Sequence, residues 1–385
     1  MTAPPLLTAE LLGTIRSQAA VVESAGRIPD ETIAALRESG IFGAFLPAEL
    51  GGSEVAPPDL ASWIEQVSAA DGSTGWCVAV ANGMSILAGY LPEAGAREIF
   101  SHPAVITGGS FNPAGRMRVL PGDAGLRVTG RWGFGSGVLH ADWMAGACLV
   151  EGDDGELAMT PEGRPDARLA FFPVSDVTVH DTWDVVGLQG TGSHDYEVVD
   201  LDVPLQQTMP FVFSPWPAGT CWRMPAMSLT IAPFAAVPLG IAQAAVDELV
   251  GLVGAKTPYR SARRAAERDV VQAKAARAEG LVASARAFLH AAVADAWETV
   301  QRGDEATMRQ RAQVRLAVVN AAQASKEAVA LCFETAGSTG LSRTHPLQRQ
   351  FRDVNTAAQH VVLATPGYET VGRIMFGLDP DTALV

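Results

Sequence analysis

The chain has 385 residues, 48% of them hydrophobic and 18% charged, which is enough for two or three packed units around a large shared core. A formal net charge of −14 argues against nucleic acid or an anionic membrane as a main partner, because both would be repelled. The four cysteines, at positions 77, 148, 221 and 332, are far apart and form no CxxC pair, so the sequence predicts buried thiols and no zinc site or disulfide framework.

The first predicted block is helical. Apolar residues recur at helical spacing from about Thr8 to Phe100, and GRIPDE, LPAELGGSEVAPPD and LPEAG interrupt them as turn or cap signals. We therefore expect an amino-terminal helical domain over residues 1–104. Its opening segment, MTAPPLLTAELLGTIR, lacks the basic start and apolar run of a secretory signal, so a cytoplasmic location is the expectation.

One stretch of this block raises the question of a membrane span. The residues from Thr74 to Leu91 carry no formal charge and are just numerous enough to cross a bilayer. Asn82, three glycines and the charged, amphipathic flanks favour a buried core helix. The sequence therefore predicts a core helix here and no contact with a membrane.

The hydrophobic period changes to two between roughly Val105 and Val212. Short runs such as LRVTGRWGF, WMAGACLV and YEVVDLDV are separated by Gly, Asp and Pro, which is typical of strands joined by turns. This pattern predicts a central β domain over residues 105–224, which ends in a tryptophan-rich linker, FVFSPWPAGTCWRMP.

The remainder of the chain has helical periodicity again. Long Ala-rich segments run from about Ile231 to Gln301, from Glu305 to Ala336 and from Leu347 to Gly377. They predict a carboxy-terminal helix bundle over residues 225–385. Long helices with Ala-rich faces commonly need a partner surface, so we expect the chain to form an oligomer.

A glycine-punctuated loop is the most informative motif. The segment DTWDVVGLQGTGSHDYEVVDLDVP, residues 181–204, places the short hydroxyls of Thr191 and Ser193 among glycines and runs into an alternating strand. Glycines relieve steric limits on the backbone, so such a loop suits the close approach of a planar polar ligand. Two further segments are distinctive, GRWGFGSGVLHADW at 130–143 and FETAGSTGLSRTHPLQRQFRDVNTAAQH at 333–360.

These three segments, in this order, resemble the acyl-CoA dehydrogenase superfamily. The second and third are typical of its group D branch of two-component flavin-dependent monooxygenases, which includes the oxygenase components of p-hydroxyphenylacetate, 3-HSA and dibenzothiophene monooxygenases. The resemblance covers most of the chain. It implies an α+β fold with amino-terminal helices, a β-barrel-like central domain and a carboxy-terminal four-helix bundle, assembled as a homotetramer of two dimers.

The resemblance also implies a reaction. A separate NAD(P)H-dependent reductase would supply reduced FMN or FAD, which would react with O2 to a C4a-hydroperoxide and hydroxylate an aromatic, polycyclic or amine molecule. FMN is favoured over FAD, because the Arg-x-Gln-Phe-Gly element that helps to hold FAD in the dehydrogenases is absent and its region reads PYRSARR.

Two residues are expected to be catalytic. His360 matches a histidine that lies beside flavin and substrate in this branch, and imidazole can take a proton from a phenol or an amine near neutral pH. Ser136 matches a serine near flavin N5 and C4a, where a hydroxyl can donate to a peroxide oxygen or accept from reduced N5. The alternatives are a packed helix histidine and a turn serine that bonds its own backbone.

Further residues are expected at the cofactor. Trp132, Phe134 and Trp183 can pack on the flavin or on an aromatic substrate, although a core role is equally open to each. Ser110 and Asn112 share an extended face that lines the flavin in the family, or else they organise the turn that follows.

The hydroxyls of Thr191 and Ser193 are also expected to contact the cofactor. A group of arginines completes the expected contacts. Arg343 and Arg349, with Arg352, frame a segment where the superfamily binds the ribityl or phosphate part of the flavin, sometimes from a neighbouring subunit. An exposed or ion-paired arginine is the alternative at each position.

Departures from the family pattern separate the alternatives. A dehydrogenase needs a glutamate as its base, and the family carries this glutamate at one of two positions. In this chain the first position falls at Val361 and the second near Thr257, and no glutamate occurs near the second position until Glu267. An acyl-CoA dehydrogenase-like FAD oxidoreductase is therefore the second hypothesis, and a non-catalytic flavin-binding scaffold is the third. Met84 stands near the place where many monooxygenase relatives carry another histidine, which puts a two-histidine mechanism in doubt.

Overall fold

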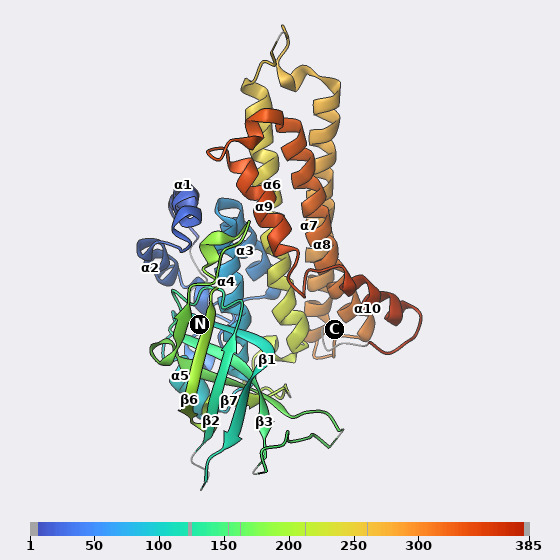
Figure 1. Ribbon diagram of the computed structural model, residues 1–385. Coiled ribbons are helices and arrows are strands. Elements are labelled where there is room, and N and C mark those ends of the chain that lie inside the picture. Colours follow the sequence, from blue (N-terminus) through green and yellow to red (C-terminus); the bar gives the residue numbers. More distant parts are fainter. Residues whose placement is uncertain are drawn as a thin grey trace.

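The computed structural model describes residues 7–121, 125–152, 154–161, 163–211, 213–259 and 261–380. Short helices at the amino-terminal end, a β sheet and long carboxy-terminal helices follow one another along the chain (Figure 1). The α+β fold expected from the sequence is confirmed.

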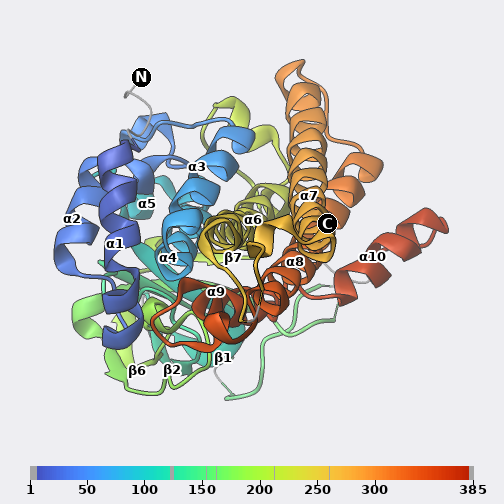
Figure 2. The ribbon, with the colours of Figure 1, turned by 90° about the horizontal axis from the view of Figure 1, so that it is seen from above.

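The amino-terminal block contains five α-helices. They are α1 (Ala9–Ala25), α2 (Asp30–Glu38), α3 (Pro57–Ala70), α4 (Gly72–Ser85) and α5 (Glu93–Ile99). The Thr8 hydroxyl caps the start of α1 by accepting from the Leu11 amide, and α1 ends at Gly26, whose φ of +65° favours glycine. Viewed from above, α3 and α4 lie between α1 and the long helix α6 (Figure 2).

Helix α4 occupies the centre of this block. Val80 is the only one of its residues that is not buried, and Asn82 donates to the carbonyl oxygens of Ile41 and Val78, each at 3.0 Å. The uncharged stretch around α4 is thus a core helix, as its composition predicts.

Helix α6 (Ala226–Ala255) is, among the described residues, the one helix long and apolar enough to cross a membrane. Its apolar stretch is 89% buried inside the protein.

The central region is one mixed sheet of seven strands. They are β1 (Thr107–Val119), β2 (Leu126–Trp132), β3 (Trp143–Glu151), β4 (Ala167–Pro173), β5 (Thr178–His180), β6 (Asp195–Val203) and β7 (Thr208–Pro210), in the order β5-β6-β2-β1-β3-β4-β7. Strands β1 and β3 pair in parallel and all other pairs are antiparallel. The register of β1 against β3 shifts between Ser110 and Gly115, which marks a bulge.

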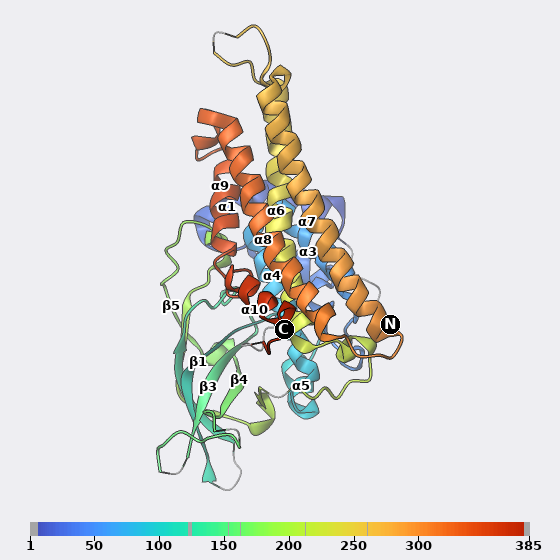
Figure 3. The same ribbon diagram turned by 90° about the vertical axis from the view of Figure 1, so that its right-hand side faces the viewer.

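The carboxy-terminal region is a bundle of α6, α7 (Asp269–Gln301), α8 (Met308–Ala336) and α9 (Pro346–Ala357), followed by α10 (Pro366–Met375) (Figure 3). The segments expected as helical over 231–301 and 347–377 are each divided in two. Pro258 lies just past α6, where Lys256 already has extended backbone, and Pro366 begins α10 at a first helical position, where its missing N–H costs no helical hydrogen bond. Helix α3 packs on α6 and joins the amino-terminal helices to the bundle.

Candidate active site

A chain of hydrogen bonds runs from α4 into the glycine-punctuated loop. The Trp76 indole N–H donates to Ser136 Oγ at 3.1 Å, and Ser136 Oγ lies 2.8 Å from Ser193 Oγ. Ser193 Oγ lies 2.7 Å from Thr191 Oγ1, which donates to the Leu188 carbonyl at 2.8 Å. Three residues expected at the cofactor, Ser136, Thr191 and Ser193, are therefore brought together, and Trp76 joins them.

The glycines of the loop allow this close packing. A Cβ at Gly190 would lie 2.2 Å from Val22 Cγ1 of α1, and one at Gly187 would lie 2.4 Å from the Arg352 carbonyl oxygen of α9. Gly192 has a φ of +51°, in the left-handed region that favours glycine. The loop is thus pressed between α1 and α9, and side chains larger than hydrogen do not fit at these positions.

Two neighbouring residues of α9 hold the same loop by polar contacts. The Leu188 amide donates to Asp353 Oδ1 at 2.6 Å, and the Arg352 guanidinium donates to the Val186 carbonyl at 2.7 Å. Leu188 has a φ of +53°, which is uncommon for a residue other than glycine. Burial raises the pKa of Asp353 to about 7, while the amide bond and the charge of Arg349 oppose this rise. The sequence pattern did not single out Asp353 for this role.

His360 follows directly after α9 and lies against two aromatic rings. Its ring is stacked on Phe234 of α6, with centroids 5.3 Å apart and planes inclined by 7°. Trp76 meets it edge-on, with centroids 5.2 Å apart. Burial lowers the pKa of His360 to about 4, so the imidazole is neutral at pH 7 and able to accept a proton.

The two aromatic partners of His360 were not predicted as site residues. Trp76 lies in the GSTGW segment at the start of α4, which could have signalled it. Phe234 lies in the apolar helix α6, where one more large apolar side chain does not stand out as a site residue.

Phe134 presents an exposed aromatic ring close in sequence to the hydroxyl chain, which consists of the linked hydroxyls of Ser136, Ser193 and Thr191. Its side chain is 76% exposed and its φ is +61°, while its ring meets that of Trp183 edge-on at 6.0 Å. The Trp183 indole N–H donates to the Leu188 carbonyl at 3.1 Å, so this ring is anchored to the same loop. An exposed aromatic ring, two residues before Ser136, offers a surface for a planar ligand.

Trp132 belongs to the core of the sheet and corrects the expectation of a cofactor contact. It is 1% exposed, its indole N–H donates to the Ala147 carbonyl at 2.8 Å, and its ring is stacked on Tyr196. A Cβ at Gly146 would lie 2.4 Å from this indole, so the glycine makes room for it. The tryptophan is enclosed by the sheet, and a ligand cannot reach it.

Ser110 and Asn112 lie in the bulged part of β1. Asn112 is exposed and Ser110 is half-buried. The backbone N–H of Asn112 donates to Ser110 Oγ at 3.4 Å. Neither residue forms a hydrogen bond with Ser136, Ser193 or Thr191. Their role at a flavin stays a prediction.

The arginines occupy different surroundings. Arg343 is exposed in the connection before α9. Arg349 lies beside the buried carboxyl groups of Asp71 and Asp353, and its charge lowers both pKa values against the larger effect of burial, which raises them. A role for these arginines at a phosphate stays a prediction.

Met84 packs against the sheet. It is 3% exposed, and its Cε would lie 2.8 Å from a Cβ at Gly109 of β1. The methionine side chain cannot exchange protons. Among the residues that the structure describes, His360 is the one imidazole whose ring packs against that of Trp76.

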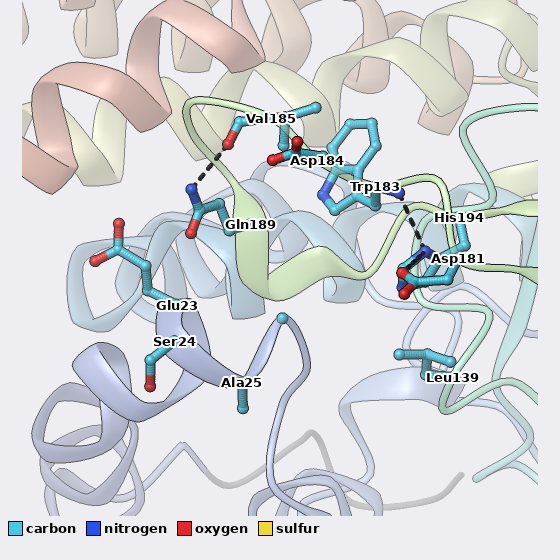
Figure 4. Close-up of a pocket in the computed structure, with 11 residues that line it drawn as sticks. Glu23, Ser24, Ala25, Leu139, Asp181, Trp183, Asp184, Val185, Gln189 and His194 are labelled. Atoms are coloured by element: carbon cyan, nitrogen blue, oxygen red, sulfur yellow. Dashed lines mark hydrogen bonds and ion pairs between the residues drawn. The ribbon is translucent and has the colours of Figure 1, made fainter.

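A polar cavity of about 280 Å³ lies on the loop, between the end of α1 and residues 181–194 (Figure 4). Trp183, Gln189 and His194 line it, together with the carboxylates of Glu23 and Asp184. Neither Ser136 nor His360 is among its lining residues. It is therefore a separate feature from the hydroxyl chain, although both share the loop.

These residues fit a flavin. Phe134 supplies an exposed ring, and the half-buried Ser136, two residues further along the chain, supplies a hydroxyl oxygen. A flavin combines a planar ring system with polar edge atoms, so this combination of groups is complementary to it.

The positions for a dehydrogenase base carry no carboxylate. Val361 is an exposed valine, and Thr257 lies in the connection that follows α6. Glu267 belongs to a short 3-10 helix, Ala265–Glu267, between α6 and α7, at the end of the bundle away from the sheet (Figures 1 and 3). A substrate beside His360 would therefore find imidazole as its base.

The sequence matches two family models. Residues 12–99 match the acyl-CoA dehydrogenase N-terminal domain, and residues 232–365 match the acyl-CoA dehydrogenase C-terminal domain. The first of these ranges contains Trp76, and the second contains Phe234, Asp353 and His360.

Individual relatives are similar over almost the whole chain. The indole-3-acetate monooxygenase of Pseudomonas putida is 33% identical over 356 residues, covering 92% of this chain and 88% of that protein. The flavin-dependent monooxygenase oxygenase subunit HsaA of Rhodococcus jostii is 28% identical, covering 91% and 92%.

A solved structure agrees. XiaF from Streptomyces, in complex with FADH2 and glycerol, has a TM-score of 0.89 at 26% identity, covering 97% of this chain and 96% of that one. Together with the sequence matches, this shows that the chain belongs to the acyl-CoA dehydrogenase family, and within it to the flavin-dependent monooxygenases.

Proposed function

We propose that this chain is the oxygenase component of a two-component monooxygenase, which takes reduced FMN or FAD from a separate NAD(P)H-dependent reductase and hydroxylates an aromatic small molecule. The observation that carries the proposal is the contact of one indole, that of Trp76, with both Ser136 and His360. A hydroxyl for the flavin and a neutral imidazole for the substrate thus both contact one ring.

The residues at the flavin have separate tasks in this proposal. Phe134 and Trp183 pack on the ring system, and Ser136 bonds its N5 edge. Ser110 and Asn112 line the flavin, and Arg343 and Arg349 serve its phosphate, in the manner of the family from a neighbouring subunit. When bound, the reduced flavin supplies the two electrons that activate O2.

His360 acts on the substrate. Its neutral ring accepts a hydrogen bond from a phenolic hydroxyl or an amine of the substrate, which raises the electron density of the aromatic ring that is to be hydroxylated. Phe234 stacks on the face of the imidazole and Trp76 meets it edge-on, and these contacts hold the ring in place. The relative named for indole-3-acetate supports an aromatic substrate.

The oligomer belongs to the proposal as well. We infer a homotetramer in which apolar side chains beyond the bundle are covered by another copy of the chain. Met375 and Phe376, at the end of α10, are 77% and 83% exposed. Exposed apolar groups this large and this close together are typical of subunit contacts.

The test is an anaerobic titration of the protein with reduced FMN and, separately, reduced FAD, followed by rapid mixing with oxygenated buffer. A delay before the oxidised flavin spectrum returns, shortened by His360→Ala and by Ser136→Ala, supports the proposal. His102→Ala, which removes an exposed histidine from the segment after α5, is the matched control and should keep the delay.

Return of the oxidised spectrum at the rate of free flavin would contradict the proposal. A yellow protein that copurifies with tightly held FAD and reduces it with an acyl-CoA would instead support the dehydrogenase-like alternative. Failure to bind either flavin would support a scaffold.

A further inference from the structure

Arg315 of α8 is a buried cation without an acidic partner. The residue is 2% exposed, and no aspartate or glutamate forms an ion pair with it in the part of the chain that the structure describes. Burial lowers the pKa of its guanidinium, and no neighbouring charge counteracts this effect. Arginine is almost never fully buried unless it is paired, because a charge away from water is costly. The contacts that Arg315 does make must therefore offset this cost.

These contacts are with two backbone carbonyl oxygens in the turn that follows His360. The Arg315 guanidinium donates to the Val361 carbonyl at 3.3 Å and also to the Val362 carbonyl. The turn itself is closed by the amides three and four positions after His360, which donate to the His360 carbonyl at 2.8 Å and 3.0 Å. Arg315 thus binds the backbone directly beyond the residue that carries the imidazole.

A proline explains why this turn needs a donor from elsewhere. In a helical turn the Val362 carbonyl would accept from the amide four positions later, but that residue is Pro366, which has no N–H. Val362 is 6% exposed, so water has little access to its carbonyl, and a buried carbonyl without a donor is unfavourable. Arg315 supplies the missing donor from another helix.

The backbone of α10 packs directly on the guanidinium. A Cβ at Gly367, in the first turn of α10, would lie 2.7 Å from Arg315 Nη2 and 2.9 Å from Arg315 Cζ. A side chain at this position would therefore push the guanidinium aside. Arg315 contacts both the turn after His360 and the start of α10, and it holds them against α8.

The peptide group that Arg315 binds lies beside the imidazole. Its oxygen is the Val361 carbonyl, and its N–H is that of Val362, which lies 3.5 Å from His360 Nδ1. At this distance the contact is weak and does not commit the imidazole proton to one nitrogen. The position of the turn, together with the two aromatic contacts of the ring, therefore sets where the imidazole stands.

We propose that Arg315 is a positioning residue for His360. It holds the peptide between residues 361 and 362, and through this peptide it fixes the imidazole, while its own burial keeps it away from flavin and substrate. The inference rests on the proposed function, in that it takes His360 as the group that acts in the reaction. Loss of Arg315 should then act through His360 and leave the binding of flavin unchanged.

The experiment measures the delay before the oxidised spectrum returns when protein loaded with reduced FMN, or separately with reduced FAD, meets oxygen. Arg315→Met removes the donors but keeps an apolar chain of similar length, which suits a buried site without a counter-ion. Arg309→Met, which removes an exposed arginine from the same helix, is its matched control. Gly367→Ala displaces the guanidinium without replacing it. Gly372→Ala is its control in α10, where no atom lies within 4 Å of the new Cβ.

We expect Arg315→Met and Gly367→Ala to shorten the delay about tenfold, the effect of one charge-assisted hydrogen bond, and no further than His360→Ala does. The dissociation constant of the reduced flavin should keep its wild-type value. The double variant of Arg315→Met with His360→Ala should have the delay of His360→Ala alone, since a positioning residue has no further effect once the residue that it positions is absent. A general loss of structure would instead weaken flavin binding and add to the effect of His360→Ala.

The outcomes separate this inference from the proposed function. If His360→Ala shortens the delay but Arg315→Met does not, or if the two effects add, the inference is wrong and the proposed function stands. If the wild-type protein shows no delay, the proposed function fails, and the NMR signals of the His360 ring protons decide the inference. These signals should shift in Arg315→Met and in Gly367→Ala but not in the two controls, and unchanged signals would overturn it.

Discussion

The Trp76 indole donates to Ser136 Oγ at 3.1 Å. The same ring lies edge-on to His360, so one side chain of α4 contacts a residue from the sheet and a residue that follows α9. These two residues are 224 positions apart in the chain, and the indole is a contact that they share. Trp76 should therefore affect both the flavin and the substrate side of the reaction.

Trp76→Phe separates these two effects. Phenylalanine keeps an aromatic ring against His360 but removes the N–H, so Ser136 loses one partner and gains freedom to turn. We expect the free energy of unfolding to fall by about 1 kcal/mol. We also expect more hydrogen peroxide and less hydroxylated product for each reduced flavin consumed, measured by a peroxide assay beside product analysis.

A matched replacement checks this prediction. Trp297→Phe makes the same change at a half-buried indole in α7, a helix that carries none of the site residues. It should leave the ratio of peroxide to product at the wild-type value. Equal ratios in Trp76→Phe and in the wild-type protein would show that the N–H does not position Ser136.

The pH dependence of the reaction should report on His360. Burial lowers its pKa from an ordinary value near 6.5 to about 4, so the neutral base is fully present at pH 6 and is lost only near pH 4. We expect the acid limb of kcat/KM for a phenolic substrate to have its midpoint near pH 4. An NMR titration of the histidine ring protons measures the same pKa directly.

Phe234→Ala should move that pKa upward, because it opens one face of the imidazole to water. His140 provides an internal control in the same spectrum. Burial also lowers its pKa to about 4, and its Nε2 accepts from the Ile28 amide, away from Phe234. A titration of His360 near 6.5 in the wild-type protein, or an equal shift of both histidines in Phe234→Ala, would contradict this account.

The sequence predicted the hydroxyls of the site but not the residues that pack on His360 and hold the loop. Ser136, Thr191 and Ser193 lie in glycine-rich segments whose backbone requirements are local, so pattern alone located them. Phe234 and Asp353 act through contacts with segments 126 and 165 positions away, and nothing in their own neighbourhoods distinguishes them from other core residues.

The errors at the level of the fold have a similar cause. Periodicity predicted helical segments over 231–301 and 347–377 but did not show that each is two helices, since single prolines also occur inside helices. Helix α6 itself contains Pro233 and Pro238. Trp132 was expected at the cofactor because it lies in a family motif, yet only the fold shows that glycines on neighbouring strands enclose it.

Asp353→Asn should change the pH dependence of stability. The pKa of Asp353 is about 7 in the folded protein, above its ordinary value of 3.8, so its ionisation opposes folding as the pH rises from about 4 to 7. Asparagine keeps an oxygen for the Leu188 amide but cannot ionise. The variant should therefore gain stability relative to the wild-type protein over this range, by on the order of 1 kcal/mol or more.

Urea unfolding at several pH values measures this difference. The two stability curves should approach each other near pH 4 and separate toward pH 7, with the variant above. Parallel curves would show that Asp353 does not titrate with a raised pKa. If the variant instead loses stability relative to the wild-type protein as the pH rises, the charge of the Asp353 carboxylate itself holds the loop.

The assembly can be tested at α10. Met375→Ser combined with Phe376→Ser removes two highly exposed apolar side chains and should convert the expected tetramer into smaller species, seen by analytical ultracentrifugation. Val199→Ser, which removes an exposed valine from β6, is the control and should not change the mass. An unchanged mass in the double variant would place the subunit contact elsewhere.

Gly187→Ala tests whether the close packing of the loop is needed. The added Cβ would lie 2.4 Å from the Arg352 carbonyl oxygen, a backbone atom that cannot turn aside, so the loop or α9 must move. We expect a loss of about 1–3 kcal/mol in the free energy of unfolding, together with weaker binding of reduced flavin, because Thr191 and Ser193 move with the loop.

Gly251→Ala makes the same substitution in α6, where no atom lies within 4 Å of the new Cβ. There the better helix propensity of alanine should raise stability by up to about 1 kcal/mol and leave flavin binding unchanged. Equal effects of the two substitutions would mean that the loop tolerates displacement, and that the hydroxyl chain does not depend on its contact with α9.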